Sequence, residues 1–432
     1  MKKPDLNSLL YSRLNFKGGI PLTDFRVIDG GITAPLGFKA AGKHVGIKRI
    51  KKDMSIVVSD VPAKAAGAYT QNLVKAAHIL WDKDITDEGR AIRGLVAVSG
   101  NANACTGQRG ITDNERMAEE LARLIGADKK EVLTAATGII GLDMPMETVV
   151  KGIKELYPDL SYRRESAKNA AAGIITTDTF IKEMALEMNI AGKTVKIGGM
   201  AKGSGMVHPN MATVLSFITT DINISQELLK KALIMSVKDT YNMISVDGAM
   251  STNDMALIMA NGLAGNAEIT EEDEFFEKFC EAVMFINEKF AIDIVHDGEG
   301  SQKFIQVDIS GGRTTEDARI LAKSIVTNDL VKTAMYGEDA NWGRIIAAMG
   351  GSGGYFDLKK LKMEFKNDKG TLLLMENGEP VPFDENIALD ILGEQDIYIK
   401  ITLGDGEGKA RSYGCDLGHE YIRINGEYRS RS

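Results

Sequence analysis

The chain has 432 residues, of which 44% are hydrophobic and 26% charged, proportions that are ordinary for a globular protein with a sizeable core. Its formal net charge of −8 argues against a nucleic-acid-binding surface, and any anionic ligand must therefore be held by local positive groups. The three cysteines, Cys105, Cys280 and Cys415, are far apart and form neither a disulfide framework nor a zinc motif.

No apolar run approaches the length of a membrane span, and the amino-terminal residues lead into no apolar stretch typical of a secretory signal. We therefore expect a cytoplasmic protein with reduced thiols and with no membrane or nucleic-acid partner. The histidines are scattered without the spacing of metal ligands, so we expect no metal site.

Strand and helix patterns alternate along the first part of the chain. Short runs rich in valine and isoleucine predict buried strands over residues 55–59 and 94–99. Residues 112–115, Thr-Asp-Asn-Glu, have the form of a capping box and predict that a helix begins there. A strand-like run over residues 131–135 leads to a Thr-Gly pair. Two more helices are expected, one over residues 226–237 with Ser225 as its cap, and one that starts near Thr270.

The pattern changes after residues 310–315, which have the composition of a junction. After this junction we expect one helix and then a strand-rich tail, with strands over residues 361–365, 371–375, 397–403 and 421–424. Mixed elements of this kind indicate layered sheets with helices outside.

One segment near the middle of the chain indicates a nucleophile. Thr213 follows a glycine-rich stretch and a small residue, Ala212. A hydroxyl needs a base to take its proton, and a threonine with a free amino terminus carries its own base, an amine with a pKa of about 8. Cleavage between Ala212 and Thr213 would create that amine. His208 is a second conceivable base, and an ordinary loop is the alternative interpretation of these residues alone.

The segment from Gly198 to Thr213, followed by Phe217 to Asp221, resembles the processing site of the glutamate N-acetyltransferase/ornithine acetyltransferase family, the self-cleaving acetyl-transfer enzymes of arginine biosynthesis. Further blocks in one common order extend the resemblance over nearly the whole chain. These blocks are residues 31–38, 99–107, 137–141, 175–179, 251–254, 297–300, 330–334, 336–337, 339–344, 414–417 and 421–425.

The resemblance implies an α/β fold, an αββα sandwich that is similar to the N-terminal-nucleophile hydrolases in its layers but not in its chain connections. It implies a catalytic region over residues 1–310 and a smaller C-terminal α/β domain over residues 311–432, whose tail closes the active site. It also implies that processing yields two chains, residues 1–212 and 213–432, and that two copies of each assemble.

The resemblance implies roles for individual residues as well. Thr213 would be the nucleophile, and Thr137 and Gly138 would form the oxyanion hole, which holds donors ready for the charge of a tetrahedral intermediate. Lys202 and Glu299 would supply the charges of both signs that a zwitterionic substrate needs once it leaves water. The full set of implied substrate-binding residues is Thr176, Lys202, Thr213, Glu299, Asn425 and Ser430.

We expect Thr213 to attack the acetyl carbonyl of N2-acetyl-L-ornithine, to release ornithine, and to pass the acetyl group to L-glutamate in a ping-pong reaction. The glycine-rich segment completes neither a P-loop nor a dinucleotide fingerprint, so we expect no cofactor. The junction over residues 208–213 resembles that of members that also accept acetyl-CoA, although no residue decides this physically.

Two other interpretations stay open. An aminopeptidase or amidase of the same architecture would use Thr213 and resolve the acyl-enzyme with water. A non-catalytic amino-acid sensor would keep Lys202 and Glu299 but would lose the nucleophile, which is present in this sequence.

Overall fold

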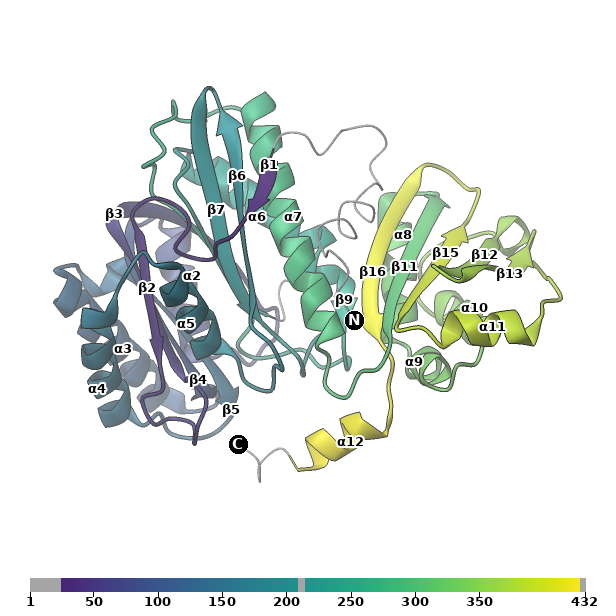
Figure 1. Cartoon of the computed structure of the whole chain (residues 1–432), viewed down its shortest axis with the longest axis horizontal. Coiled ribbons are helices and arrows are strands. Elements are labelled where there is room, and N and C mark those ends of the chain that lie inside the picture. Colours follow the sequence, from purple (N-terminus) through teal and green to yellow (C-terminus); the bar gives the residue numbers. More distant parts are fainter. Residues whose placement is uncertain (1–24, 209–213, 428–432) are drawn as a thin grey trace.

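A computed structural model describes residues 25–208 and 214–427 (Figure 1). Within these residues the chain forms one sheet of nine strands and one of seven, with helices packed against them. None of the described helices has both the length and the apolar composition required to cross a bilayer.

The nine-stranded sheet has the order β1-β6-β7-β8-β10-β3-β4-β5, with β2 paired to β3. β8 and β10 run parallel, as do β4 and β5, and the other neighbours are antiparallel. The strands are β1 (Phe25–Ile28), β2 (Phe38–Lys43), β3 (Met54–Tyr69), β4 (Ile92–Asn101), β5 (Val132–Ile139), β6 (Lys182–Ile190), β7 (Lys193–Lys202), β8 (Leu215–Thr220) and β10 (Met255–Ala260).

The long strand β3 belongs to two layers at once. Its first part pairs with β2 and β4, its last part pairs with β10, and the register shifts between Val58 and Ala63. One apolar cluster joins side chains of β4, β8 and β10, among them Leu95, Phe217 and Leu257, to those of α2 (Ala77–Asp87) and α5 (Arg164–Ile174).

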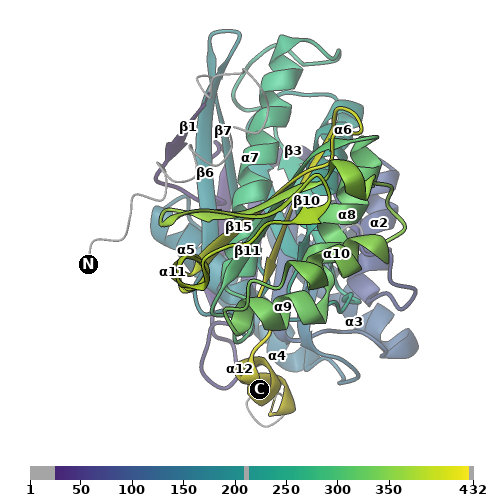
Figure 2. The same cartoon turned by 90° about the vertical axis from the view of Figure 1, so that its right-hand side faces the viewer.

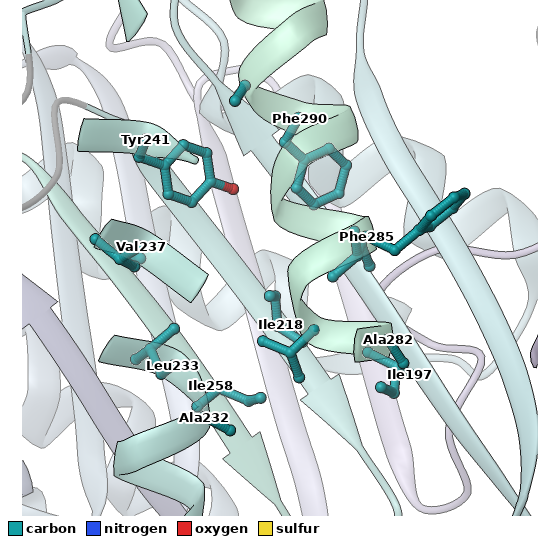
Figure 3. Packing of buried hydrophobic residues seen from close by; sticks show 14 of the residues in the cluster. Ile197, Ile218, Ala232, Leu233, Val237, Tyr241, Ile258, Ala282, Phe285 and Phe290 are labelled. Carbon is teal, nitrogen blue, oxygen red and sulfur yellow. The ribbon is translucent and has the colours of Figure 1, made fainter. Parts of the chain in front are cut away.

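Helices cover the outer faces of these layers. α6 (Gln226–Asp239) packs over β3 and β10, and α7 (Glu274–His296) packs over β6 and β7. Leu233 of α6 and Phe290 of α7 belong to the same buried cluster as Ile218 of β8 (Figure 3). α3 (Gly107–Ile125) and α4 (Met146–Leu156) pack against the layer of β2, β3 and β4. The predicted αββα sandwich is therefore confirmed.

The seven-stranded sheet has the order β14-β13-β12-β15-β11-β16-β9. Its strands are β9 (Ile244–Ser245), β11 (Phe304–Gly312), β12 (Lys362–Asn367), β13 (Gly370–Glu376), β14 (Glu379–Pro380), β15 (Asp396–Thr402) and β16 (Gly408–Cys415). A second core forms between this sheet and α8 (Thr315–Thr327), α9 (Asp329–Tyr336), α10 (Trp342–Gly350) and α11 (Glu385–Leu392) (Figure 2). The division of the chain at residue 310 stays a prediction, and two strands of this sheet, β9 and β11, begin before it.

Several predicted elements are confirmed. Residues 55–59 lie in β3 and residues 94–99 in β4, and the strands expected over 361–365, 371–375 and 397–403 correspond to β12, β13 and β15. Ser225 caps α6, and its hydroxyl accepts the Leu228 N–H.

Two predicted helix starts are wrong. α3 begins at Gly107 rather than at the capping box, and the Thr112 hydroxyl donates to the Gln108 carbonyl inside the helix. α7 begins at Glu274 rather than near Thr270, because the Asp273 carboxylate accepts the N–H groups of its first turn. Thr112 therefore lies inside α3, whose N-cap residue Thr106 makes no side-chain capping bond, whereas Asp273 is the cap of α7.

The tail also differs from the prediction. Three helices, α8, α9 and α10, follow the junction instead of one, and α11 is a further helix between β14 and β15. Residues 421–424 belong to the helix α12 (His419–Gly426) instead of a strand. The run Tyr-Ile-Arg-Ile is too short to separate a two-residue period from a helical one. Four short 3₁₀ helices complete the described elements: Lys129–Glu131, Tyr157–Asp159, Tyr241–Met243 and Leu358–Lys360.

Candidate active site

A pocket of about 270 Å³ opens at the ends of β5 and β7, beside the start of β10. α12 crosses from the second sheet back toward the first and closes one side of the pocket with Asn425 (Figure 1). The lining includes these residues that the sequence singled out: Thr137, Gly138, Thr176, Lys202, Glu299 and Asn425. It also includes residues to which the sequence gave no role, among them Ser251, Asn253 and Asp254.

The predicted cleavage and nucleophile residues, Ala212 and Thr213, lie outside the described residues, as does Ser430. Their described neighbours along the chain lie beside the pocket. The Val214 carbonyl accepts the N–H of Met255, the residue that follows the pocket-lining Asp254, at 2.8 Å. On the other side of the gap, Met206 lines the pocket, and its N–H donates to Asp247 at 2.6 Å.

Thr137 and Gly138 form the part of the lining where β5 ends. Gly138 has a φ of 136°, and a side chain there would overlap the backbone of Gly100, so only glycine fits this position. Asn253 holds in place the backbone that leads into this pair. Its side-chain amide donates to the carbonyls of Ala102 and Ala136, the residue before Thr137, at 2.5 and 2.9 Å. The backbone of the Thr-Gly pair is therefore fixed before any substrate arrives.

Lys202 connects the two threonines of the pocket. Its ammonium donates to the hydroxyl of Thr137 at 3.1 Å and lies 3.5 Å from that of Thr176. An ammonium group has three donors and no acceptor, so the Thr137 oxygen is the acceptor in this bond. The hydroxyl hydrogen of Thr137 is consequently left to donate to a third group in the pocket.

Glu299 is the carboxylate of the lining that the sequence singled out, and it is only 8% exposed. The Asn425 amide donates to its carboxylate at 2.8 Å, and the Glu299 N–H donates to the Ser204 carbonyl at 3.0 Å. A side chain at Gly205 would overlap the Glu299 carboxylate, which explains a glycine at that position. The pocket thus presents an ammonium and a carboxylate to the same small space.

Asp254 is a second carboxyl group in the lining, and the sequence gave it no role. It is 6% exposed, and among the described residues its Oδ2 atom has no hydrogen-bond partner. Burial raises the pKa of the Asp254 carboxyl well above its usual range, and Lys202 opposes this shift only in part. Its position directly before the apolar run of β10, in the block of residues 251–254, was the available signal.

His208 does not belong to the pocket lining. Its Nδ1 atom lies 3.2 Å from the Ser245 hydroxyl. Burial, assisted by the charge of Lys323, lowers the pKa of His208 to about 4. The imidazole is therefore a weak base near neutral pH, which disfavours the role that the sequence left open for it. Within the described residues no cluster of His, Cys, Asp or Glu side chains is placed to hold a metal ion.

Comparison with known proteins assigns the chain to a family. The model of the ArgJ family matches residues 39–430. The chain belongs to the ArgJ family. This match confirms the family resemblance that was inferred from the sequence.

Individual ArgJ relatives match along almost their whole length. The arginine biosynthesis bifunctional protein ArgJ of Thermotoga neapolitana is 48% identical, over 92% of this chain and 99% of that protein. Its counterparts in Caldanaerobacter subterraneus and Bacillus subtilis are 46% and 42% identical, over 94% and 93% of this chain and 100% and 97% of those proteins. Among solved structures, the ornithine acetyltransferase of Mycobacterium tuberculosis, complexed with ornithine, is 36% identical, covering 44% of this chain and 100% of that chain, with a TM-score of 0.41.

A buried ion cluster behind the pocket is a feature of this ArgJ chain that the sequence analysis did not foresee. The Lys182 ammonium pairs with Asp178 at 2.7 Å and with Asp297 at 2.5 Å, and these side chains are at most 1% exposed. Asp178 also accepts the N–H groups of Thr176 and Gly203 at 3.0 and 2.9 Å. Burial alone would raise the pKa of Asp178, but Lys182 and Lys202 lower it to about 2. The cluster thereby fixes two loops of the lining.

Replacing Lys182 by methionine should therefore destabilise the protein strongly. The variant leaves two buried carboxylates without their cation, a loss that typically costs about 3–5 kcal/mol. We expect a large drop in the midpoint of thermal unfolding. The exposed pair of Lys83 and Asp87 provides the control, because Lys83→Met should change the midpoint little. Equal midpoints for Lys182→Met and the unmodified protein would contradict the assigned role.

Proposed function

We propose that this chain transfers the acetyl group of N2-acetyl-L-ornithine to L-glutamate through an acetyl ester on Thr213. Membership of the ArgJ family makes the chain an enzyme of arginine biosynthesis with an acyltransferase role. The observation that carries the finer proposal is the convergence of Thr137, Gly138, Lys202 and Glu299 on one small pocket beside Val214.

In the first half-reaction the Thr213 hydroxyl attacks the acetyl carbonyl and its proton passes to the free α-amine of the same residue. The Gly138 N–H and the Thr137 hydroxyl donate to the oxyanion that forms, and Lys202 supports the Thr137 donation from behind. The bond from the carbonyl carbon to the ornithine nitrogen then breaks. The nitrogen takes the proton from the α-amine and ornithine leaves.

In the second half-reaction the glutamate amine attacks the ester carbonyl. The bond from the carbonyl carbon to the Thr213 oxygen breaks, and that oxygen regains a proton released by the amine. Lys202 and Glu299 suit the carboxylate and the ammonium of the two amino-acid substrates. A lining that presents both an ammonium and a carboxylate favours an amino-acid acceptor over water, which an amidase would require.

We also propose that the chain cuts itself between Ala212 and Thr213 and that two copies of each fragment assemble in the cytoplasm. The cut supplies the α-amine on which the mechanism depends. We propose acetyl-CoA as a second acetyl donor and no resident cofactor. The word "bifunctional" in the names of the relatives supports the second donor.

Lys202→Ala and Glu299→Gln should each raise the KM of an amino-acid substrate by about tenfold or more, because each removes a charged partner from the pocket lining. The measurement is acetyl transfer from acetylornithine to glutamate at varied concentrations of both. Lys64→Ala, on a partly exposed lysine paired with Glu268, serves as the control and should leave both KM values unchanged. Unchanged kinetics in both pocket variants would reject the binding roles. Release of acetate at a rate independent of glutamate would favour the amidase.

A further inference from the structure

A strongly basic loop interrupts the acidic character of this chain. Residues 47–52, Ile-Lys-Arg-Ile-Lys-Lys, connect β2 to β3 and carry four positive charges in a protein whose formal net charge is −8. Arg49, Ile50 and Lys51 at its tip are exposed, and Ile50 is 86% exposed. We refer to residues 47–52 as the basic loop.

The basic loop is rigidly built in spite of its exposure. The buried carboxylate of Asp53 accepts the backbone N–H groups of Val45, Gly46, Ile47 and Lys48 at 2.7 to 3.2 Å. The Asp53 carboxylate is thus occupied by these backbone donors and by the His44 ring, and it is buried away from the exposed tip.

The basic loop also lies against the wall of the active-site pocket. Lys48 donates to the Ile175 carbonyl at 2.8 Å, and Lys51 donates to the carbonyls of Thr176 and Asp178 at 3.3 and 3.2 Å. Thr176 is part of the pocket lining. The charged tip is therefore fixed at the rim of the pocket.

A second contact ties the basic loop to the end of β5. A side chain at Gly100 would lie 2.8 Å from the Lys48 side chain, and Gly100 in turn packs against Gly138. The loop and the proposed oxyanion hole are therefore separated by a single backbone layer.

The charges of the loop and the pocket act on each other. Burial lowers the pKa of Lys48 to about 8, and the charges of Lys51 and Lys202 contribute in the same direction. An anion bound beside these lysines would relieve their repulsion. Arg49 is exposed, and within the described ranges its guanidinium makes no hydrogen bond or ion pair, so it can bind such an anion.

A donor of acetyl groups that is larger than the pocket would need this surface. The cavity of about 270 Å³ suits an acetylated amino acid, whereas the nucleotide and phosphates of coenzyme A must remain outside it. Phosphates bind to clustered arginine and lysine, and the acidic remainder of the chain would repel them.

We infer that the basic loop binds the phosphate groups of acetyl-CoA while the thioester enters the pocket. The loop then determines the use of the polyanionic donor and is dispensable for acetylornithine. This inference rests on the proposed second donor activity.

The test compares the two donors in the same variant. Arg49→Glu reverses an exposed charge that makes no hydrogen bond or ion pair among the described residues. Lys193→Glu, at the exposed turn between β6 and β7, reverses a remote charge. Arg49→Glu should raise the KM of acetyl-CoA about tenfold or more and leave the kinetics with acetylornithine within about twofold. Lys193→Glu should change neither. The KM of acetyl-CoA should also rise with salt in the unmodified protein, more steeply than that of acetylornithine.

The outcomes separate the loop from the donor activity. If the unmodified protein transfers acetyl from acetylornithine but neither uses acetyl-CoA nor binds coenzyme A in calorimetry, the second donor activity is rejected and the loop's role falls with it. If acetyl-CoA is used and Arg49→Glu leaves its KM unchanged, the loop's role alone is overturned. Equal losses with both donors would reveal a general structural effect and would also overturn it.

Discussion

Thr213→Ala is expected to yield one uncut chain of 432 residues that transfers no acetyl group. The variant removes the proposed nucleophile of both the cut and the transfer, so the loss of turnover should be at least about 10⁴-fold. A denaturing gel and an intact-mass measurement report the cut, and acetylglutamate formation reports the transfer. The unmodified protein should give two chains, residues 1–212 and 213–432.

Thr213→Ser is the matched control, because it keeps a hydroxyl in the same position along the chain. It should retain the cut and a measurable rate of transfer. An unmodified protein that is fully active as a single uncut chain would reject the mechanism, since no α-amine would then exist at Thr213.

Thr137→Ala should lower kcat by about tenfold to a thousandfold with both donors and leave KM nearly unchanged. The reason is that Lys202 donates to the Thr137 oxygen, which leaves the hydroxyl hydrogen for the oxyanion. That interaction strengthens as the charge develops, so its loss acts on turnover rather than on binding. The measurement is steady-state acetyl transfer by a protein that has completed the cut.

Two variants accompany Thr137→Ala. Thr137→Ser should recover most of the rate because it restores the donor. Thr134→Ala, on the same strand, removes a hydroxyl that donates to the buried Asp82 at 3.2 Å, and it should affect stability more than turnover. Wild-type turnover in Thr137→Ala would remove this residue from the oxyanion hole.

The sequence predicted which residues line the pocket better than it predicted the buried residues that hold them in place. Thr137, Thr176 and Lys202 were singled out from separate blocks, and the structure brings them within hydrogen-bonding distance around one ammonium. The cluster behind them was not predicted, because Lys182 and Asp297 lie 115 positions apart and no local pattern reports such a pairing. The roles of Thr137, Thr176 and Lys202 in binding and catalysis stay predictions.

Local sequence patterns located the buried strands reliably, but they placed only one of three helix starts correctly. Ser225 was correctly assigned as a cap, since its hydroxyl accepts the Leu228 N–H in the first turn of α6. The capping box at residues 112–115 failed because α3 was already under way from Gly107. The sharing of β3 between two layers depends on a register shift that alternation alone does not encode.

The order of strands in the first sheet constrains when the proposed cut could occur. β8 and β10, which follow the proposed cut, lie between β7 and β3, which precede it. The two fragments could separate only if the pairing of β7 with β8 and that of β10 with β3 were both broken. The cut alone would therefore release neither fragment. For the same reason, residues 1–212 produced alone would expose the unpaired edges of β7 and β3. Unpaired strand edges of this kind favour aggregation. If the proposed cut occurs, we therefore expect the chain to fold before it is cut. Fragments 1–212 and 213–432 that are produced separately should then fail to reconstitute the enzyme.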